Sequence, residues 1–256
     1  MNFSEKHAII TGGANGIGRC IAEYFARAGV FVAVIDTDKQ AGENLLKQYK
    51  NICFIHGDIA NREIIDTYIH SQNTLPVDFV INNACISRKG ILSDCSWDDF
   101  EYVQRVGLTA PYYLVSALRQ AKKLAKGASI VNIASTRGMQ SHADTESYSA
   151  AKGGILALTH AMSVSLAGQA RVNSISPGWI DTAAYHGEGK STNHSNEDEI
   201  QHPAGRVGRP EDIAEMVMFL CDNDRAGFIT GENIIIDGGM SKLMVYHGDN
   251  GWNYKQ

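Results

Sequence analysis

The 256-residue sequence has few of the features that mark several other classes of protein. It holds only five prolines, with no proline-rich linker and no internal repeat, so nothing in it suggests a boundary between domains. No run approaches the roughly 18 apolar residues that a membrane-spanning helix requires, and its first six residues lack the pattern of a signal peptide. The formal net charge of −5 gives no excess of basic residues of the kind that binds nucleic acid. We therefore expect a cytoplasmic protein without nucleic-acid or membrane partners.

Neither a disulfide framework nor a metal site is indicated. No Cys-x-x-Cys pair occurs among the five widely spaced cysteines, which are Cys20, Cys53, Cys85, Cys95 and Cys221. We expect these thiols to be reduced and mostly buried. His186, His194 and His202 recur every eight residues, but they lack any further ligand spacing, so a hydrated loop is the better interpretation and no metal is predicted.

Short apolar runs rich in branched residues alternate with stretches of helical length and period. The predicted strands are His7–Thr11, Val30–Asp36, Ile52–Gly57, Asp78–Asn83, Ser129–Ala134, Arg171–Ser176 and Asn233–Asp237. The predicted helices include Ile17–Ala28, Arg62–Ser71, Trp97–Ala125, Tyr148–Leu166 and Pro210–Cys221. This alternation predicts an α/β fold, a Rossmann-type doubly wound parallel sheet of about seven strands with helices on both faces.

We expect a single domain over residues 1–240, followed by a tail over residues 241–256. Because the tail contains Tyr246, Trp252 and Tyr254, it is predicted to pack on the core or on another subunit. The segment Asp181–Pro203 departs from the alternation, since it is polar and has no clear period. A loop of this length is usually functional or disordered.

A glycine-rich turn follows the first predicted strand in the run from Thr11 to Gly18. Gly12 permits a tight turn, Gly16 lets backbone N–H groups approach a pyrophosphate, and Gly18 allows a helix to pack closely on the strand. An ordinary strand–turn–helix corner would have the same composition. The turn predicts a nucleotide site only together with other features.

Asp36 supplies one such feature, eighteen residues beyond Gly18 and at the end of the second predicted strand. An acid near this offset hydrogen-bonds the adenosine ribose, and its charge repels a 2′-phosphate. Neither Thr37 nor residues 13–15 offer a Lys or Arg that would neutralise such a phosphate. Asp36 therefore favours NAD over NADP, although a helix N-cap would explain an aspartate here as well.

Tyr148 and Lys152 are separated by one helical turn, so the phenol and the ammonium share one face and can act on one proton. A surface tyrosine and a solvated lysine are the alternative. With a nucleotide site in the same chain, the pair favours redox chemistry.

The glycine-rich turn, Asp36 and the Tyr148–Lys152 pair resemble the motifs of the short-chain dehydrogenase/reductase family and follow one another in the same order. The resemblance covers about residues 5–240. It also rests on Asp58, Asn82-Asn83-Ala84, Ser135, Pro177-Gly178 and Asp237-Gly238-Gly239. The resemblance implies that Ser135 orients the substrate oxygen and that Tyr148 transfers the hydroxyl proton. Lys152 then stabilises the phenolate and holds the nicotinamide ribose.

The resemblance also implies a cofactor site and an assembly. The implied cofactor-binding residues are Gly12, Asn15, Gly16, Ile17, Gly18, Asp36, Asp58, Ile59, Asn83, Ala84, Cys85, Tyr148, Lys152, Pro177, Gly178, Ile180 and Thr182. The implied assembly is a homotetramer or homodimer, with Trp97–Ala125 and Tyr148–Leu166 in one interface and the last strand in another.

Two positions depart from the family pattern. Cys85 follows Asn-Asn-Ala where the family usually has glycine, and Gly107 replaces the catalytic asparagine of the long fourth helix. In the family fold these positions are neighbours, so the larger residue and the smaller one can compensate in volume. We hypothesise that the proton relay survives, with an extra water or the Cys85 thiol in the space left at Gly107.

The resemblance places substrate selection in segments that are polar in this chain, and the predicted contacts are Arg137, Gln140, His142, Trp179 and His186. Such groups suit a polyhydroxylated substrate, because a steroid or fatty acyl chain would leave them unpaired. Arg137 also offers a partner for a carboxylate or phosphate. Solvated loops would be equally polar. We expect an NAD-dependent dehydrogenase for a sugar or polyol; the alternatives are a 3-oxoacyl-type reductase and a non-catalytic dinucleotide sensor or scaffold.

Overall fold

The computed structural model describes residues 3–71, 75–186, 192–244 and 246. Its strands are β1 (His7–Thr11), β2 (Phe31–Asp36), β3 (Ile52–His56), β4 (Val77–Asn82), β5 (Leu124–Ile133), β6 (Ala170–Pro177) and β7 (Asn233–Ile236). Its helices are α1 (Gly16–Arg27), α2 (Lys39–Gln48), α3 (Arg62–His70), α4 (Trp97–Gln104), α5 (Ala110–Gln120), α6 (Glu146–Ser165), α7 (Asn196–Ile200), α8 (Pro210–Cys221) and α9 (Asn223–Ala226). Each of the seven predicted strands is present within a few residues.

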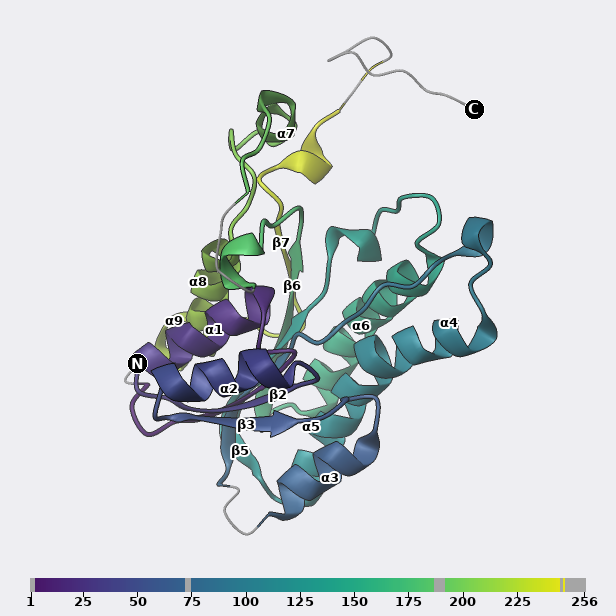
Figure 1. Cartoon of the computed structure of the whole chain (residues 1–256). Coiled ribbons are helices and arrows are strands. Elements are labelled where there is room, and N and C mark those ends of the chain that lie inside the picture. Colours follow the sequence, from purple (N-terminus) through teal and green to yellow (C-terminus); the bar gives the residue numbers. More distant parts are fainter. Residues whose placement is uncertain (1–2, 72–74, 187–191, 245, 247–256) are drawn as a thin grey trace.

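The strands form one parallel sheet in the order β3-β2-β1-β4-β5-β6-β7. The chain builds outward from β1 to β3 and then returns to add β4 beside β1, so the order reverses between β1 and β4. Figure 1 shows α1 and α8 on one side of the sheet and α5 and α6 on the other. This is the predicted doubly wound fold. In such sheets ligands bind beyond the carboxyl ends of the strands at the point of reversal.

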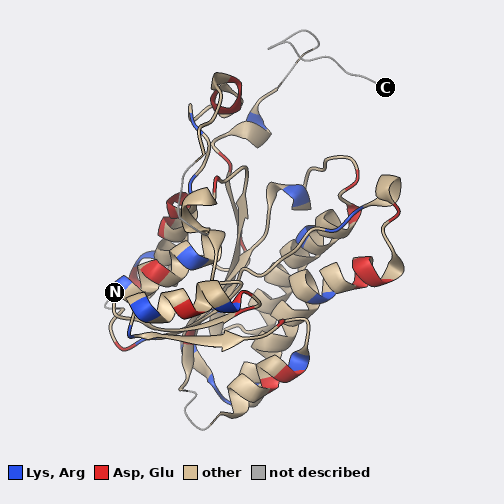
Figure 2. Ribbon diagram, in the orientation of Figure 1, with Lys and Arg blue, Asp and Glu red and all other residues tan. Residues whose placement is uncertain are grey.

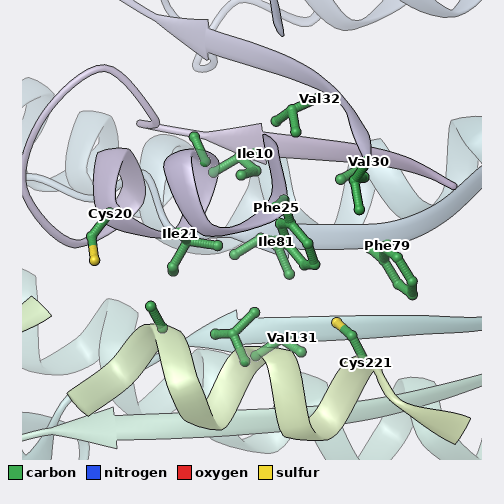
Figure 3. Close-up of a cluster of buried hydrophobic side chains, with 14 of the residues drawn as sticks. Ile10, Cys20, Ile21, Phe25, Val30, Val32, Phe79, Ile81, Val131 and Cys221 are labelled. Carbon is green, nitrogen blue, oxygen red and sulfur yellow. The ribbon is translucent and has the colours of Figure 1, made fainter. Parts of the chain in front are cut away.

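Each face of the sheet is covered by helices, because successive strand side chains point to opposite faces. Ala8 and Ile10 of β1 enter the cluster beneath α1, α2 and α8, whereas Ile9 between them enters the cluster beneath α3, α5 and α6. In Figure 3, α1 and α8 pack over β-strand side chains such as Phe79 and Val131. Both faces are therefore buried, as a parallel sheet requires.

The predicted helix Trp97–Ala125 is interrupted in the structure. α4 ends at Gln104, a π-helical turn occupies Arg105–Thr109, α5 ends at Gln120, and β5 begins at Leu124. Lys122 stops the helix with a left-handed φ of 59°, a conformation that no α-helix contains. The spacing of the apolar residues did not reveal where the helix ends, because the residues before β5 continue a helical period.

The loop Asp181–Pro203 contains local structure that its composition did not indicate. A 3₁₀ turn occupies Ala183–Tyr185, and α7 begins after Ser195, which forms a reciprocal capping box with Asp198. Residues 187–191 lie outside the described residues. In the tail, Leu243, Met244 and Tyr246 are exposed, whereas Trp252 and Tyr254 lie outside the described residues. Packing of the tail on the core or another subunit stays a prediction.

All five cysteines are free, as predicted, but most are not buried. Cys20 and Cys221 lie in the cluster beneath α1 and α8 (Figure 3), where burial raises the pKa of each thiol to about 12. Cys53 is exposed because β3 is an edge strand, and Cys85 and Cys95 are partly buried.

The distribution of charged residues and the lengths of the helices agree with what we expected from the net charge and from the short apolar runs. Basic residues lie among acidic ones on the same helices (Figure 2). In the described part of the chain, no helix combines the length and hydropathy that crossing a bilayer demands.

Candidate active site

The glycine-rich turn joins β1 to α1 and is held by β4. Gly12 has a left-handed φ of 64°, and its carbonyl accepts a hydrogen bond of 2.7 Å from the Asn83 side-chain amide. Thr11 Oγ1 accepts bonds of 3.1 Å from the backbone N–H groups of Asn83 and Ala84. The start of α1 is thereby fixed against the carboxyl ends of two strands. Thr11 was not among the predicted site residues, because its role depends on a strand 72 residues away.

Asp36 ends β2 and faces the same turn. Its carboxylate accepts from the Ala14 N–H at 2.9 Å and from the Asp38 N–H at 3.0 Å. The N-cap of α2 is Asp38, which accepts from the Ala41 N–H. The alternative interpretation of Asp36 as a helix cap is therefore wrong.

Asp58 follows β3 and is held by a residue that the sequence analysis missed. Its carboxylate accepts from the Ala60 N–H at 2.9 Å and from the Tyr102 hydroxyl at 2.6 Å. The hydrogen bond to this carboxylate, reinforced by desolvation, raises the pKa of Tyr102 above its ordinary value. Tyr102 lies on α4, and no local pattern marks it as a partner of Asp58.

A cavity of about 470 Å³ runs along the carboxyl ends of the strands. Of the predicted cofactor-binding residues, it is lined by Gly12, Asn15, Ile17, Asp36, Asp58, Ile59, Asn83, Ala84, Cys85, Tyr148, Lys152, Pro177, Gly178, Ile180 and Thr182. Tyr102, Ser135 and Val106 line it as well. Gly16 and Gly18 lie in the first turn of α1 and are not part of this lining. Its acidic end at Asp36, glycine-rich middle and Tyr148–Lys152 end fit an extended dinucleotide.

Ser135, Tyr148 and Lys152 meet at one end of this cavity. Lys152 is buried, and its Nζ donates a 2.6 Å hydrogen bond to the Ile133 carbonyl at the end of β5. The same Nζ lies 5.5 Å from the centre of the Tyr148 ring. Ser135 comes two residues after Ile133, so the β5 end and α6 position all three side chains.

Cys85 and Gly107 are in contact at the same end. A Cβ atom added to Gly107 would lie 3.1 Å from Cys85 Sγ and 3.1 Å from Ala151 Cβ. The thiol therefore takes up part of the space that a side chain at position 107 would need. Gly107 lies in the π-helical turn Arg105–Thr109, and such turns often occur at functional sites.

We expect the Cys85→Gly and Gly107→Asn substitutions to be energetically coupled. Gly107→Asn alone crowds the thiol, and Cys85→Gly alone leaves a gap. The double variant should therefore lose less free energy of unfolding than the two single losses combined, by about 1 kcal/mol or more. Urea unfolding of the four proteins measures this difference. Additive losses would contradict steric compensation, and a rise in turnover of orders of magnitude in Gly107→Asn would contradict a working substitute relay.

A second cavity, of about 700 Å³, opens beside the first. Four of the predicted substrate contacts line it, namely Arg137, Gln140, His142 and Trp179. The two cavities share Ser87, Ser135, Tyr148, Gly178 and Ile180. The structure separates His186 from these residues: its Nδ1 lies 2.9 Å from the Thr182 carbonyl, and its Cε1 would lie 3.2 Å from a Cβ at Gly16. His186 therefore lies over the glycine-rich turn, on the cofactor side.

The loop after β6 is organised around Asp181 and Trp179. Asp181 accepts hydrogen bonds from the Thr192 hydroxyl at 2.6 Å and from His194 Nε2 at 3.0 Å. Burial alone would raise the pKa of Asp181, but its hydrogen bonds outweigh burial and lower the pKa to about 2. The rings of His194 and His202 both pack near Trp179, with centroids 5.5 and 6.0 Å away.

The three histidines were predicted to belong to a hydrated loop, and these contacts change that interpretation for His194 and His202. His202 is buried, at 2% exposure, because it packs under Trp179 and against Gly238. His194 is partly buried, and His186 stands apart on the cofactor side. Within the described ranges, no three His, Cys, Asp or Glu side chains gather as metal ligands.

Comparison with known proteins agrees with this geometry. Residues 12–241 match the family model described as enoyl-(acyl carrier protein) reductase. An uncharacterized oxidoreductase of Thermotoga maritima is 41% identical over 250 residues, which cover 94% of this chain and 98% of that protein. The 3-oxoacyl-[acyl-carrier-protein] reductase FabG of Chlamydia muridarum is 33% identical, covering 92% of this chain and 97% of the relative.

Among solved structures, an apo SCOR enzyme from Clostridium thermocellum superposes with a TM-score of 0.88 at 43% identity, covering 98% of this chain and 99% of that one. The match therefore extends over the sheet, the glycine-rich turn and the Ser135–Tyr148–Lys152 end alike. The chain belongs to the classical short-chain dehydrogenase/reductase family and is an oxidoreductase with a nicotinamide-cofactor site.

Proposed function

We propose that this protein is an NAD-dependent dehydrogenase that interconverts a secondary alcohol and a ketone on a sugar or polyol. The observation that carries the proposal is the meeting of two cavities at Ser135 and Tyr148. One cavity has the lining of a dinucleotide site, and the other carries several hydrogen-bonding side chains and has room for a second molecule. A hydroxyl held by Ser135 and Tyr148 would face both.

The proposed chemistry assigns each side chain one task. A bound nicotinamide supplies the acceptor or donor of hydride. Tyr148 takes the hydroxyl proton during oxidation and returns it during reduction, as general acid–base catalysis requires. Ser135 orients the substrate oxygen. Lys152, buried and anchored at the Ile133 carbonyl, stabilises the phenolate by its charge.

The preference for NAD rests on Asp36. Its carboxylate is fixed by two backbone N–H groups at the end of the cofactor cavity. A 2′-phosphate placed there would meet a negative charge, and the residues from 12 to 18 and at 37 provide no Lys or Arg to offset it.

Asp36→Asn tests this preference. Removing the charge should raise the ratio of kcat/KM with NADP⁺ to kcat/KM with NAD⁺ by about tenfold or more, since hydrogen bonds to charged groups contribute about 1.5–3 kcal/mol. Asp38→Asn is the matched control, because Asp38 is also held by a backbone N–H and carries the same charge two residues away. Equal ratios in Asp36→Asn and the unmodified protein would refute the assignment.

The sugar or polyol substrate rests on the second cavity. Besides Arg137, Gln140 and His142, its lining includes Ser141, Gln201 and the flat ring of Trp179. These side chains place hydrogen-bonding groups at several points of the wall. A fatty acyl chain would leave them unpaired.

A 3-oxoacyl-type reductase is the second candidate, favoured by relatives such as the FabG of Chlamydia muridarum. Steady-state assays separate it from the first. They offer NAD⁺ or NADP⁺ with a panel of polyols, hydroxy acids and secondary alcohols, and NADH or NADPH with a 3-oxoacyl thioester. Oxidation of polyols with NAD⁺ supports our proposal. Reduction of a 3-oxoacyl thioester with NADPH, without polyol oxidation, would replace it. Cofactor binding without any turnover favours a sensor or scaffold.

We also propose a homotetramer or homodimer built on α4, α5 and α6. Several large apolar side chains on these helices are exposed in the single chain, namely Trp97, Phe100, Tyr112 and Val164. Large apolar side chains exposed in a single chain favour burial against another copy of it. Light scattering of the purified protein determines the oligomeric state.

A further inference from the structure

We infer that the substrate carries an anionic oxygen group, a carboxylate or a phosphate, and that Arg137 binds this group in the second cavity. The inference rests on the proposed function, because it assigns a ligand to the cavity that shares Ser135 and Tyr148 with the cofactor site. It narrows the substrate from polyols in general to polyols that bear a negative charge.

The first argument is the balance of charge around the cavity. Its described lining contains Arg137 and His142 but no Asp or Glu. The two nearest acids in the sequence are engaged elsewhere. Asp144 accepts from the Leu92 N–H and the Ser93 hydroxyl, and Glu146 accepts from the Ile91 N–H. The wall therefore offers an anion a positive partner without a competing carboxylate.

The second argument is the state of Arg137 itself. The side chain is partly buried, yet within the described residues it forms no ion pair and no side-chain hydrogen bond. Other partly buried arginines are satisfied: Arg19 pairs with Glu23, and Arg171 donates to Asn223 and to the Leu220 carbonyl. Withdrawing a guanidinium from water without a partner is unfavourable. An anionic ligand supplies the missing partner, and the guanidinium fork matches carboxylate and phosphate geometry.

The third argument is the rigidity of the backbone that carries Arg137. The residue lies in a 3₁₀ turn, Thr136–Gly138, and its N–H donates to Ser135 Oγ at 3.1 Å. The next residue, Gly138, packs so closely on α6 that an added Cβ would lie 2.7 Å from the Lys152 carbonyl oxygen. The backbone of Arg137 is thus fixed relative to both Ser135 and Lys152. A charge bound by Arg137 would set which hydroxyl of a polyol reaches Tyr148.

Three probes with the same six-carbon chain test the inference: sorbitol without charge, gluconate with a carboxylate, and sorbitol 6-phosphate. Their binding to the full-length protein saturated with NADH is measured by calorimetry, so no turnover is needed. At least one anion should bind about tenfold or more tightly than sorbitol, and its affinity should fall as salt rises. Whichever anion binds more tightly identifies the carboxylate or the phosphate as the natural group.

Variants of Arg137 locate the contact. Arg137→Gln should weaken binding of the preferred anion by about 10- to 100-fold, the range expected for a lost hydrogen bond to a charged group. Arg137→Lys should recover part of this loss because it keeps the charge. Arg119→Gln, an exposed position on α5 outside both cavities, removes one positive charge as the control. An equal loss in Arg119→Gln would show that net charge, and not the cavity, attracts the anion.

Two further results overturn the inference: neither anion binds more tightly than sorbitol, or Arg137→Gln binds the anion as well as the unmodified protein. These failures are distinguishable from failure of the proposed function. If sorbitol is oxidised with NAD⁺ but the anions bind no more tightly than sorbitol, the proposed reaction is supported and the anion site is refuted. If the anions bind through Arg137 but no probe is oxidised or reduced, the anion site is supported and the proposed reaction is refuted.

Discussion

Replacing Tyr148 by phenylalanine should lower kcat by about 10²- to 10⁴-fold, because general acid–base catalysis contributes on that order. Tyr148 lies where the two cavities meet, with the buried Lys152 ammonium 5.5 Å from its ring centre. Phenylalanine keeps the ring and its packing, but it has no proton to exchange. The loss should therefore appear in turnover with the substrate identified by the assay panel, measured as NADH formation.

Cofactor binding separates a chemical loss from a structural one. NAD⁺ titrations of Tyr148→Phe, followed by the change in tryptophan fluorescence, should show a dissociation constant within a few-fold of the original. Tyr49→Phe is the matched control, since Tyr49 follows α2 and lines neither cavity. Full turnover in Tyr148→Phe would show that another group moves the proton, and Ser135 would then be the next residue to test.

Replacing Gly18 by alanine should destabilise the fold by about 3 kcal/mol, the upper part of the usual range for overpacking. The added Cβ would lie 2.1 Å from the Gly12 carbonyl oxygen and 2.5 Å from Asn83 Nδ2. Those two atoms are hydrogen-bonded to each other, so α1 must move away from the turn and from β4. Urea unfolding measures the loss, and weaker NAD⁺ binding should accompany it because the turn is displaced.

Gly153→Ala provides a control of opposite sign. Gly153 also lies in a helix, α6, but an added Cβ there would meet only the Gly138 carbonyl oxygen at an ordinary 3.5 Å. Alanine is favoured over glycine in helices by about 1 kcal/mol, so this variant should be slightly more stable. If both variants lost stability equally, contact with the turn at Gly12 would not be the cause in Gly18→Ala.

Much of the fold was predictable because its determinants are local. Branched apolar runs form strands that are buried on both faces, and helical periods between them return the chain to the sheet in parallel. The glycine-rich turn could be recognised for the same reason, since only a residue without a Cβ at position 18 allows the Gly12 carbonyl to lie as close as it does. The break near Gly107 could not be predicted, because the buried residues on both sides of it, such as Val103, Val106, Ala110 and Leu114, recur at the spacing of one continuous helix.

Sequence alone determined the alternation of strands and helices, the glycine-rich turn, the acid at the end of β2 and the one-turn spacing of Tyr148 and Lys152. These depend on backbone sterics and on spacing along the chain. Only the tertiary structure decided which distant residues meet: Tyr102 at Asp58, Cys85 at Gly107, and His186 over the turn instead of in the second cavity. Such contacts arise from packing between elements that lie far apart in the chain, and no local pattern records them.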